Sequence, residues 1–457
     1  MRCTYRHFVI LSGLTCMLSC RPGEPESLPE NRMILATVLE RSVREDVLSK
    51  WYPYSVDETY GGFFSTYTHD FQLTGPQDKM IVTQARHVWV NALCAELYPE
   101  VEHYKQSAAQ GYNFLRNVMW DNQYGGFYGL VDRQGNVKSE SKTSYGNAFA
   151  MYALAAYYKT SGDTSALELA KKTFYWQEEH AHDPEYGGYF QNFKQDGTPY
   201  KNTDETSYRS LFGFKGQNTS IHTLEAFTEF YQVWPDSLLR ERLTEIFYIV
   251  RDTIVNKKGY LHLYFYKDWT PFSLQDSTEE AILRYHGLDH VSFGHDVETA
   301  YLLLEAAQVL GLANDTTTWQ IAQRMVDHAL QRGWDEEQGG FYEEAYYFKD
   351  KGFAVTHDTK NWWAQAEGLN ALLIMADQYP GNSMQYFDKF RKQWEYIDTH
   401  LIDHEHGDWY QGGLDKDPEQ KTRLKGSIWK GTYHHVRALT NCIRRLQKEE
   451  TARIKTE

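Results

Sequence analysis

The chain has 457 residues, of which 41% are apolar and 15% aromatic, and its formal net charge is −15. This acidic balance argues against binding to nucleic acid or to an anionic membrane surface through charge. Its 34 Tyr, 23 Phe and 13 Trp residues are typical of proteins that stack on sugar rings, although a large aromatic core gives the same composition.

The N-terminal segment is predicted to be a bacterial signal peptide that ends at a lipid anchor. Arg2 and Arg6 precede the apolar stretch 8–18, which is too short to span a bilayer. The following Ser19-Cys20 resembles a lipoprotein cleavage site with Cys20 as the lipidated residue, and Cys16 is the weaker alternative. We expect an exported lipoprotein of the cell envelope, in the periplasm or at the outer membrane, that contacts the membrane only through the lipid at Cys20. Its predicted parts are a signal peptide (1–19), a flexible tether (20–28) and one folded domain (29–457).

A loop of the form aromatic-Gly-Gly-aromatic recurs along that domain. It stands at 60–63, 124–127 and 186–189, and Gly339-Gly340-Phe341 is a fourth copy. Degenerate copies at 258–260 and 406–409 fill the two gaps in the series. A supersecondary unit repeated six times explains this spacing. Turn residues and aromatic residues after the Gly pairs predict short hairpins inside the loops.

Twelve segments with helical periodicity alternate around these loops. The first helix of each pair is predicted at 31–48, 101–118, 165–179, 237–255, 316–332 and 383–400. The second is predicted at 80–97, 145–160, 219–233, 294–310, 362–378 and 427–446. A long Gly-bearing loop precedes every second helix, whereas short turns lead on to the next first helix. The sequence therefore predicts an all-α fold, an (α/α)6 barrel whose ligand mouth lies at the long-loop end.

Two cysteines remain after the predicted leader, Cys94 and Cys442. They exclude a disulfide framework and a cysteine metal site. Both are expected at a similar depth on neighbouring inner helices, and an envelope location would permit a disulfide between them.

If the second helices form the inner ring, the residues at their N-termini converge at the mouth. The candidate site residues, in chain order, are Arg86, Tyr145, Asn147, Asn218, His222, His295, Glu298, Trp362, Trp363, Glu367, Trp429 and His434. His295 and Glu298 are three residues apart and would share one helix face. An imidazole beside a carboxylate is a proton-transfer unit with a pKa near working pH. The six helix N-termini would add a positive field that favours an anionic intermediate.

These residues also have structural explanations. A salt-bridged core arginine would account for Arg86, and a hydrogen-bonded core histidine would account for His222. Only one member of each adjacent pair, Trp362-Trp363 and His434-His435, can point into the barrel. A purely structural explanation does not account for the convergence of all six helix ends.

Five motifs follow one another in a fixed order: Gln84-x-Arg86, His222-x-Leu224-Glu225-Ala226, Gly294-His295-x-x-Glu298, Trp362-Trp363-x-Gln365-x-Glu367 and Trp429-Lys430-x-x-Tyr433-His434. In order and spacing they resemble the N-acylglucosamine 2-epimerase superfamily, and within it the cellobiose and mannobiose 2-epimerases. The resemblance implies that His295 and His434 are the acid/base pair and that Arg86, His222 and Glu298 surround them. The predicted lipoprotein signal departs from the family pattern.

The same residues fit the chemistry of C2 epimerisation without that resemblance. Inverting a sugar at C2 needs a base on each face of a planar enediolate, and histidines suit that task. We expect His295 and His434 to flank the sugar, Arg86 to stabilise the enediolate oxygen, and Glu298 to orient His295. His222 is expected to assist ring opening or to hold O1 and O2. Trp429 and one of Trp362 and Trp363 are expected to stack on sugar rings.

The prediction is therefore a carbohydrate 2-epimerase that acts on the reducing end of a β-1,4-linked disaccharide, without a metal or other cofactor. The alternatives are an aldose–ketose isomerase, an N-acylglucosamine 2-epimerase, a glycoside hydrolase and a non-catalytic sugar-binding lipoprotein. A hydrolase would need two carboxylates that flank the scissile bond, whereas the mouth offers mainly histidines. The sequence favours a monomer but does not define the oligomeric state or the sugar.

Overall fold

The computed structural model describes residues 31–200 and 215–454. The predicted signal peptide, Cys20 and the tether lie outside the described residues, so the lipid anchor stays a prediction. Within the two described ranges, no helix combines the length and the apolar character that a bilayer span requires.

The described chain is mainly helical, and the twelve predicted helices are all present. The inner helices are α3 (Ile81–Leu97), α5 (Ser144–Ser161), α7 (Gln217–Val233), α10 (Phe293–Leu310), α12 (Trp362–Gln378) and α14 (Tyr433–Ile454). The outer helices are α1 (Arg32–Arg41), α4 (Glu102–Phe114), α6 (Thr164–His180), α8 (Ser237–Ile249), α11 (Thr316–Gly333) and α13 (Tyr386–His400). Helical turns extend three of the outer helices: η1 (Ser42–Leu48) with α2 (Ser49–Trp51), η2 (Leu115–Met119) and η3 (Val250–Ile254).

The last inner helix begins later than predicted, at Tyr433 instead of residue 427. The Ser427 hydroxyl accepts hydrogen bonds from the backbone N–H groups of Trp429 and Lys430. Such a side-chain bond to the backbone stabilises a turn in place of the first helical turn. Trp429 therefore lies in the loop before α14.

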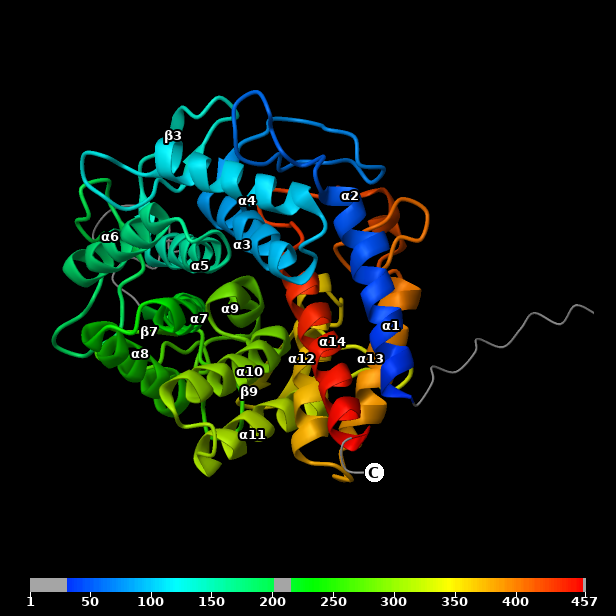
Figure 1. Cartoon of the computed structure of the whole chain (residues 1–457). Coiled ribbons are helices and arrows are strands. Elements are labelled where there is room, and N and C mark those ends of the chain that lie inside the picture. The colour runs from blue at the N-terminus through cyan, green and yellow to red at the C-terminus, as the bar shows by residue number, and fades with distance from the viewer. Residues whose placement is uncertain (1–30, 201–214, 455–457) are drawn as a thin grey trace, which may run out of the picture.

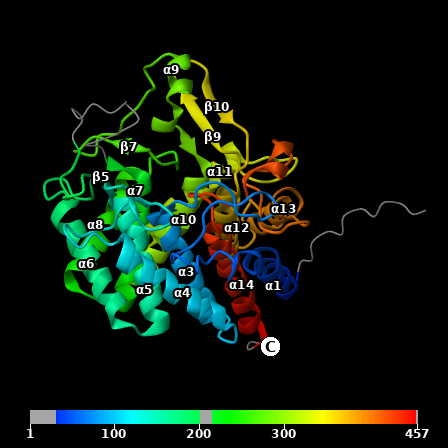
Figure 2. The ribbon, with the colours of Figure 1, turned by 90° about the horizontal axis from the view of Figure 1, so that it is seen from above.

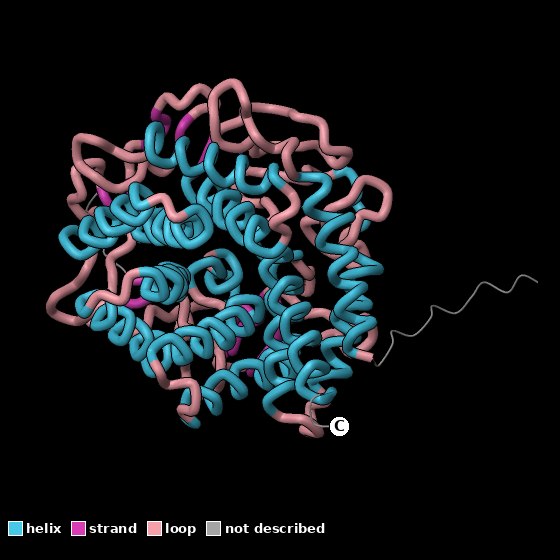
Figure 3. Tube along the Cα trace, in the orientation of Figure 1, coloured by secondary structure: helices cyan, strands magenta, loops and turns pink. Residues whose placement is uncertain are grey.

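The inner helices form a closed ring in the order α3, α5, α7, α10, α12, α14 (Figures 1 and 3). Each outer helix from α4 onward packs on the inner helix that precedes it in the chain, to which a short connection joins it. The first outer helix has no preceding partner, and α1 instead packs on α14 and closes the outer ring (Figure 1). The result is the predicted (α/α)6 barrel, closed by the two ends of the described chain.

Short strands gather at one end of this barrel. They are β1 (Lys79–Met80), β2 (Leu130–Val131), β3 (Val137–Ser139), β4 (Lys142–Thr143), β5 (Asn192–Phe193), β6 (Lys215–Gly216), β7 (Tyr264–Phe265), β8 (Val291–Ser292), β9 (Glu344–Phe348) and β10 (Gly352–His357). Figure 2 shows β9, β10 and the short helix α9 (Glu279–Arg284) projecting beyond this end.

Each long loop pairs with the strand before the preceding inner helix. The pairs are β1 with β2, β4 with β5, β6 with β7, and β8 with β9. Isolated bridges from Asn361 to Gly412 and from Tyr67 to Gly426 complete the series. Backbone hydrogen bonds therefore join all six loops around the rim, and they fix where each inner helix begins.

A buried Asp–Lys ion pair holds most of these loops. Asp335 accepts hydrogen bonds from two backbone N–H groups of its own loop, at Glu337 and Gln338. Its other oxygen lies 2.9 Å from Nζ of Lys360, which also donates to the Gly339 carbonyl at 2.9 Å. The equivalent pairs are Asp57–Lys79, Asp121–Lys142, Asp183–Lys215 and Asp403–Lys425, at 2.6–3.0 Å.

The Gly pair allows the loop to approach the inner helix closely. Gly62 has φ +69°, and a Cβ there would lie 2.6 Å from Oε1 of Gln84. That oxygen accepts the N–H of Phe63 at 2.8 Å, and the Gln84 amide donates to the Phe63 carbonyl at 2.9 Å. Gln365 bonds Phe341 in the same way. A side chain at Gly62 would displace this buried contact.

The hydrophobic core runs between the two rings of helices, and both cysteines lie in it. Cys94 and Cys442 are fully buried and free, so the disulfide considered between them is not formed. Burial raises the pKa of both thiols, which keeps them protonated and unreactive.

The Asp–Lys pairs predict an acid-sensitive fold. Burial opposes ionisation of Asp335, but hydrogen bonds from Lys360 and from the backbone lower its pKa to about 2. Ionised Asp335 contributes fully to the free energy of unfolding above about pH 4, which is the pKa of an aspartate in the unfolded chain. This contribution is lost as the pH falls towards about 2. We expect Asp335→Asn to cost about 2 kcal/mol at neutral pH and to weaken the pH dependence in that window, as measured by urea unfolding. The exposed neighbour Glu337→Gln is the control, and equal pH dependence in both variants would contradict the prediction.

Candidate active site

Each inner helix carries one buried side chain at the same interval from a residue in the loop before it. Counting seven residues from Lys79, Lys142, Lys215, Val291, Lys360 and Lys430 gives Arg86, Phe149, His222, Glu298, Glu367 and Arg437. All six of these side chains are buried. They form one layer across the barrel, near the N-terminal ends of the inner helices.

Arg437 lies at the centre of this layer and contacts three carboxylates. Its Nη2 is 2.6 Å from Glu298 and 2.7 Å from Glu367, and its Nη1 contacts Glu225. The Tyr433 hydroxyl donates to Glu225 at 2.5 Å. One guanidinium therefore holds carboxylates from α7, α10 and α12 together.

The three carboxylates differ in pKa because they share one cation. Burial raises the pKa of Glu225, but Arg437 and His222 outweigh it and lower the value to about 2. Burial and the neighbouring Glu367 raise the pKa of Glu298 to about 7. For Glu367, burial outweighs the opposing effect of Arg437 and also gives about 7. The layer therefore binds and releases protons near neutral pH.

His434 is held by Glu367. Its Nδ1 lies 2.6 Å from Oε1 of Glu367 and 3.9 Å from Oε1 of Glu298. An ionised Glu367 accepts from Nδ1 and leaves Nε2 as the basic nitrogen, whereas a protonated Glu367 donates to Nδ1 and leaves the imidazole proton on Nε2. Burial, Arg86 and Arg437 lower the pKa of His434 well below its ordinary value.

His295 has a different partner from the predicted one. Its Nδ1 lies 2.7 Å from the Ser292 hydroxyl, and Glu298, the predicted partner, contacts Arg437 and His434 instead. The predicted contact was wrong because the two side chains, three residues apart on α10, point in different directions. Glu298 extends to Arg437 at the barrel axis, whereas His295 bonds Ser292.

The expected imidazole pKa near neutral pH is also wrong for His295. Burial, with nearby His222 and His290, lowers its pKa to about 3. His295 is therefore neutral at rest, and within the layer the carboxyl groups of Glu298 and Glu367 have pKa values of about 7.

Both histidines pack on the same indole. The Trp363 ring centroid lies 4.7 Å from that of His295 and 5.8 Å from that of His434. His295 and Trp363 are partly exposed, whereas adjacent Trp362 is buried below the Lys430 ammonium. The structure thus brings the predicted histidine pair together and selects Trp363, not Trp362, as the tryptophan beside it.

Arg86 and His222 lie on the other side of the site. The Arg86 guanidinium donates to the Tyr145 hydroxyl at 3.1 Å and stacks on Phe149 and Tyr433 at 4.3 and 4.9 Å. Asn218, which is partly exposed, also hydrogen-bonds Tyr145. His222 Nδ1 is 2.8 Å from Glu225.

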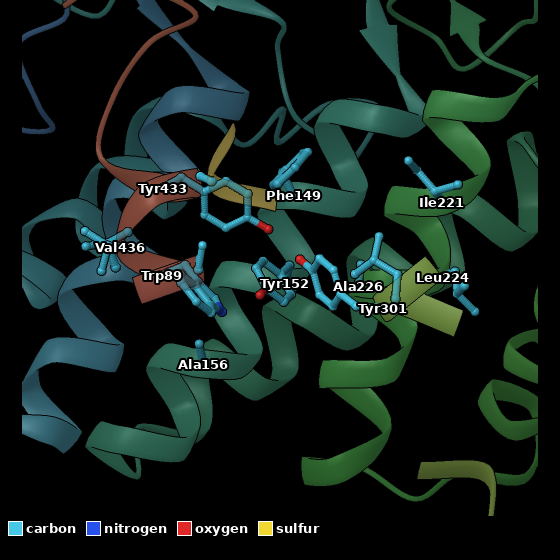
Figure 4. Packing of buried hydrophobic residues seen from close by; sticks show 14 of the residues in the cluster. Trp89, Phe149, Tyr152, Ala156, Ile221, Leu224, Ala226, Tyr301, Tyr433 and Val436 are labelled. Atoms are coloured by element: carbon cyan, nitrogen blue, oxygen red, sulfur yellow. The ribbon is translucent and has the colours of Figure 1, made fainter. Parts of the chain in front are cut away.

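Aromatic rings pack under this part of the site. Figure 4 shows Trp89, Phe149, Tyr152 and Tyr433, which come from three inner helices and lie together. Trp89 stacks on Tyr152 at 5.1 Å and meets the edge of Tyr433 at 5.3 Å. This packing supports Phe149 and Tyr433, the two rings on which the Arg86 guanidinium stacks.

Two other predicted residues are not part of the polar cluster. Asn147 is fully buried, accepts the Phe127 N–H at 3.1 Å and donates to the Thr143 carbonyl at 2.9 Å. It holds a Gly-Gly loop as Gln84 does, so the predicted role in substrate binding is wrong. Trp429 is 55% exposed in the loop before α14, where it can contact a ligand that extends outward.

Beyond the Arg437 layer, at the C-terminal ends of the inner helices, lies a cavity of about 360 Å³. Arg437 and Glu225 form its inner wall, and Lys159, Glu229 and Glu305 are among the other lining residues. No histidine lines it among the described residues. The layer therefore divides the barrel interior into an end with the histidines and an end without them.

Sequence reasoning missed Arg437 and Ser292 and did not include Glu225 among the site residues. A signal for Arg437 was available, because it follows Lys430 by the same interval as Glu367 follows Lys360. The interval became meaningful once the structure showed that both lysines bond an aspartate of the preceding loop, Lys360 to Asp335 and Lys430 to Asp408. Ser292 had no such signal, since a serine before a helix reads as an N-cap.

Three known proteins are similar to the chain over most of its length. The cellobiose 2-epimerase of Bacteroides fragilis is 28% identical over 418 residues, which cover 88% of this chain and 97% of that protein. The structure of the cellobiose 2-epimerase of Spirochaeta thermophila superposes with a TM-score of 0.75 at 28% identity, over 91% of this chain and 97% of that one. The D-mannose isomerase of Marinomonas mediterranea is 24% identical over 90% of this chain and 97% of its own length.

The profile of the N-acylglucosamine 2-epimerase (GlcNAc 2-epimerase) family matches residues 62–438, which include every candidate site residue named above. The chain therefore belongs to the N-acylglucosamine 2-epimerase family of carbohydrate epimerases and isomerases.

Proposed function

We propose that the enzyme epimerises the reducing-end sugar of a β-1,4-linked disaccharide of the cellobiose or mannobiose type at C2. The observation that carries this proposal is the pair of neutral imidazoles, His295 and His434, packed on one indole from non-adjacent inner helices. The similarity to two cellobiose 2-epimerases supports the choice of substrate class.

The reaction starts from the open-chain aldehyde. One imidazole removes the C2 proton and leaves a cis-enediolate, and the other protonates C2 from the opposite face. His295 is the base at rest, because its pKa is about 3 and Ser292 fixes its orientation. His434 shares a proton with Glu367, whose pKa is about 7, and this pair supplies the incoming proton. In the reverse direction the two roles exchange.

Arg86 and His222 act on the oxygens of the sugar. The Arg86 guanidinium is held by stacking on two rings, so it is positioned before the enediolate oxygen becomes negative. Glu225 fixes the orientation of the His222 ring, which can then pass a proton during ring opening. Tyr145 and Asn218 complete the polar contacts near these two groups.

An aldose–ketose isomerase is the second candidate, because the D-mannose isomerase of Marinomonas mediterranea is similar over nearly its whole length. Return of the proton to C1 would use the same residues. Incubation with cellobiose, mannobiose, lactose, mannose and N-acetylglucosamine in heavy water separates the candidates. We expect a 2-epimeric disaccharide that carries deuterium at C2, detected by chromatography and NMR. A ketose product would indicate the isomerase, and free monosaccharides a hydrolase.

Replacement of either histidine tests the two-base assignment. His295→Ala and His434→Ala should each lower kcat by about two to four orders of magnitude, the usual effect of losing a general acid or base. His404→Ala, whose side chain is 61% exposed, is the matched control and should retain wild-type turnover. Near-full epimerisation by either active-site variant would refute the assignment.

The role of Glu367 has a pH signature. Because the carboxyl group loses its proton above about pH 7, the His434–Glu367 pair loses the proton that it shares, and kcat/KM should fall above that pH in both directions of the reaction. Glu367→Gln cannot ionise, so it should have lower kcat/KM and no alkaline decline near pH 7. An unchanged pH profile in this variant would show that Glu367 does not hold the transferred proton.

Trp429 tests the size of the substrate. Its exposed indole in the loop before α14 is expected to stack on the second sugar, so Trp429→Ala should raise KM for the disaccharide several-fold with little change in kcat. Tyr175→Ala, at a ring that is 49% exposed on outer helix α6, should leave KM unchanged. An equal rise of KM for a monosaccharide would place Trp429 at the reacting sugar.

A further inference from the structure

One of the six loops departs from the common construction. Asn256 and Val291 stand where most of the other loops have the buried Asp and Lys, and Asn256 accepts the loop N–H groups of Lys258 and Gly259 without an ion pair. Between these positions the chain carries α9 and the short 3-10 helix η4 (His286–Leu288). It then pairs through β8 with the central strand of a three-stranded sheet in the order β10-β9-β8.

Three histidines surround one carboxylate in this sheet. Glu344 on β9 pairs in register with Ser292 of β8 and with His357 of β10. Its Oε2 lies 2.6 Å from Nδ1 of His286 and 3.0 Å from Nδ1 of His357, and its Oε1 lies 3.6 Å from Nε2 of His290. One carboxylate thus faces nitrogen atoms from three segments of the chain.

The orientation of His290 suits metal coordination. Its Nδ1 lies 2.7 Å from the His286 carbonyl oxygen, so Nδ1 carries the proton and the Nε2 lone pair points toward Glu344. An imidazole that donates one N–H to a backbone carbonyl and offers the other nitrogen is the usual arrangement of a metal-binding histidine.

The distances also suit a metal. One ligand atom each from His286, His290 and Glu344 lies within 4.8 Å of the other two. Around a tetrahedral zinc ion, with bonds of about 2.0–2.2 Å, such atoms stand about 3.4 Å apart. Small rotations of these side chains would therefore bring the three atoms into a coordination sphere. The His286 and His357 side chains are 38% and 42% exposed, which leaves an ion a path to the site.

Two other groups of histidines and carboxylates are less suited to bind a metal ion. Glu298, Glu367 and His434 also lie within 4.8 Å of one another, but the Arg437 guanidinium already occupies the space between the two carboxylates. In the polar loop at 403–408, Nε2 of His404 binds the Asp398 carbonyl at 2.8 Å and faces away from a common centre with His406. The three-histidine cluster has no arginine or lysine bonded to Glu344 among the described residues.

We propose that His286, His290 and Glu344, with His357 as the fourth ligand, bind a divalent transition-metal ion of the zinc class. Imidazole nitrogens with a single carboxylate favour this class of ion over magnesium or calcium. The ion would hold β8, β9 and β10 together in the loop that lacks the Asp–Lys pair. Ser292, on β8, orients His295, so the site stabilises the backbone next to a proposed catalytic residue.

The test uses the full chain after treatment with EDTA and dialysis. Titration with Zn²⁺ alone, followed by calorimetry, should show one equivalent bound per chain. Co²⁺ should give the intense visible absorption of a tetrahedral site. His290→Ala and Glu344→Gln should each weaken binding by at least about 10-fold, because each removes one ligand. His404→Ala is the matched control and should bind like the wild type.

His286→Ala is the third ligand variant and is not expected to misfold. The His286 side chain lies on the surface, and its removal leaves the strand pairing intact. Absence of stoichiometric Zn²⁺ binding by the wild type would overturn the proposal, as would wild-type affinity in all three ligand variants. An increased KM for the disaccharide in Glu344→Gln, with no metal bound by the wild type, would assign the cluster to sugar binding instead. These measurements need no epimerase activity for their main readout, so failure of the proposed function would leave them valid.

Discussion

The contact of Arg437 with three carboxylates is the interaction on which the interior of this barrel depends. Glu225, Glu298 and Glu367 come from three different helices, and each is at most 5% exposed. Carboxylates buried this deeply are tolerated only when a cation and hydrogen bonds compensate them, and removal of the partner of a buried ion pair typically costs about 3–5 kcal/mol. Arg437 is therefore a structural requirement of the same layer that positions His222 and His434.

Arg437 compensates the charge of the three carboxylates only in part, and this decides where protons bind in the layer. One guanidinium cannot keep three buried carboxylates ionised, so the pKa values of Glu298 and Glu367 rise to about 7. The same burial keeps both imidazoles neutral. Protons near neutral pH thus reside on the carboxyl groups next to the histidines. A site that transfers protons between two faces of a sugar needs such a store beside a neutral base.

The repeated loops explain why corresponding residues of the inner helices lie in one layer. In most repeats a buried lysine is tied to an aspartate and to the first glycine carbonyl, and the loop is hydrogen-bonded to its neighbour around the rim. In these repeats the inner helix begins two residues after the tied lysine, and the residue seven positions after that lysine lies in the Arg437 layer. The loop that precedes His295 lacks this tie and has a three-histidine cluster instead. This repeat carries His295, the proposed base at rest.

Helical periodicity and the spacing of the Gly pairs were sufficient to predict the twelve helices, their alternation and the barrel, because both signals are local to the chain. They also identified the end of the barrel at which the His, Arg and Trp side chains collect. The choice of partners was decided only by the tertiary structure. The rotation of helices that are far apart in sequence decides three contacts. It determines whether His434 contacts Glu298 or Glu367, whether Asn147 faces the active site or a loop, and whether α1 packs on α14. The central role of Arg437 depends on three such helices at once, and no spacing within a single helix encodes it.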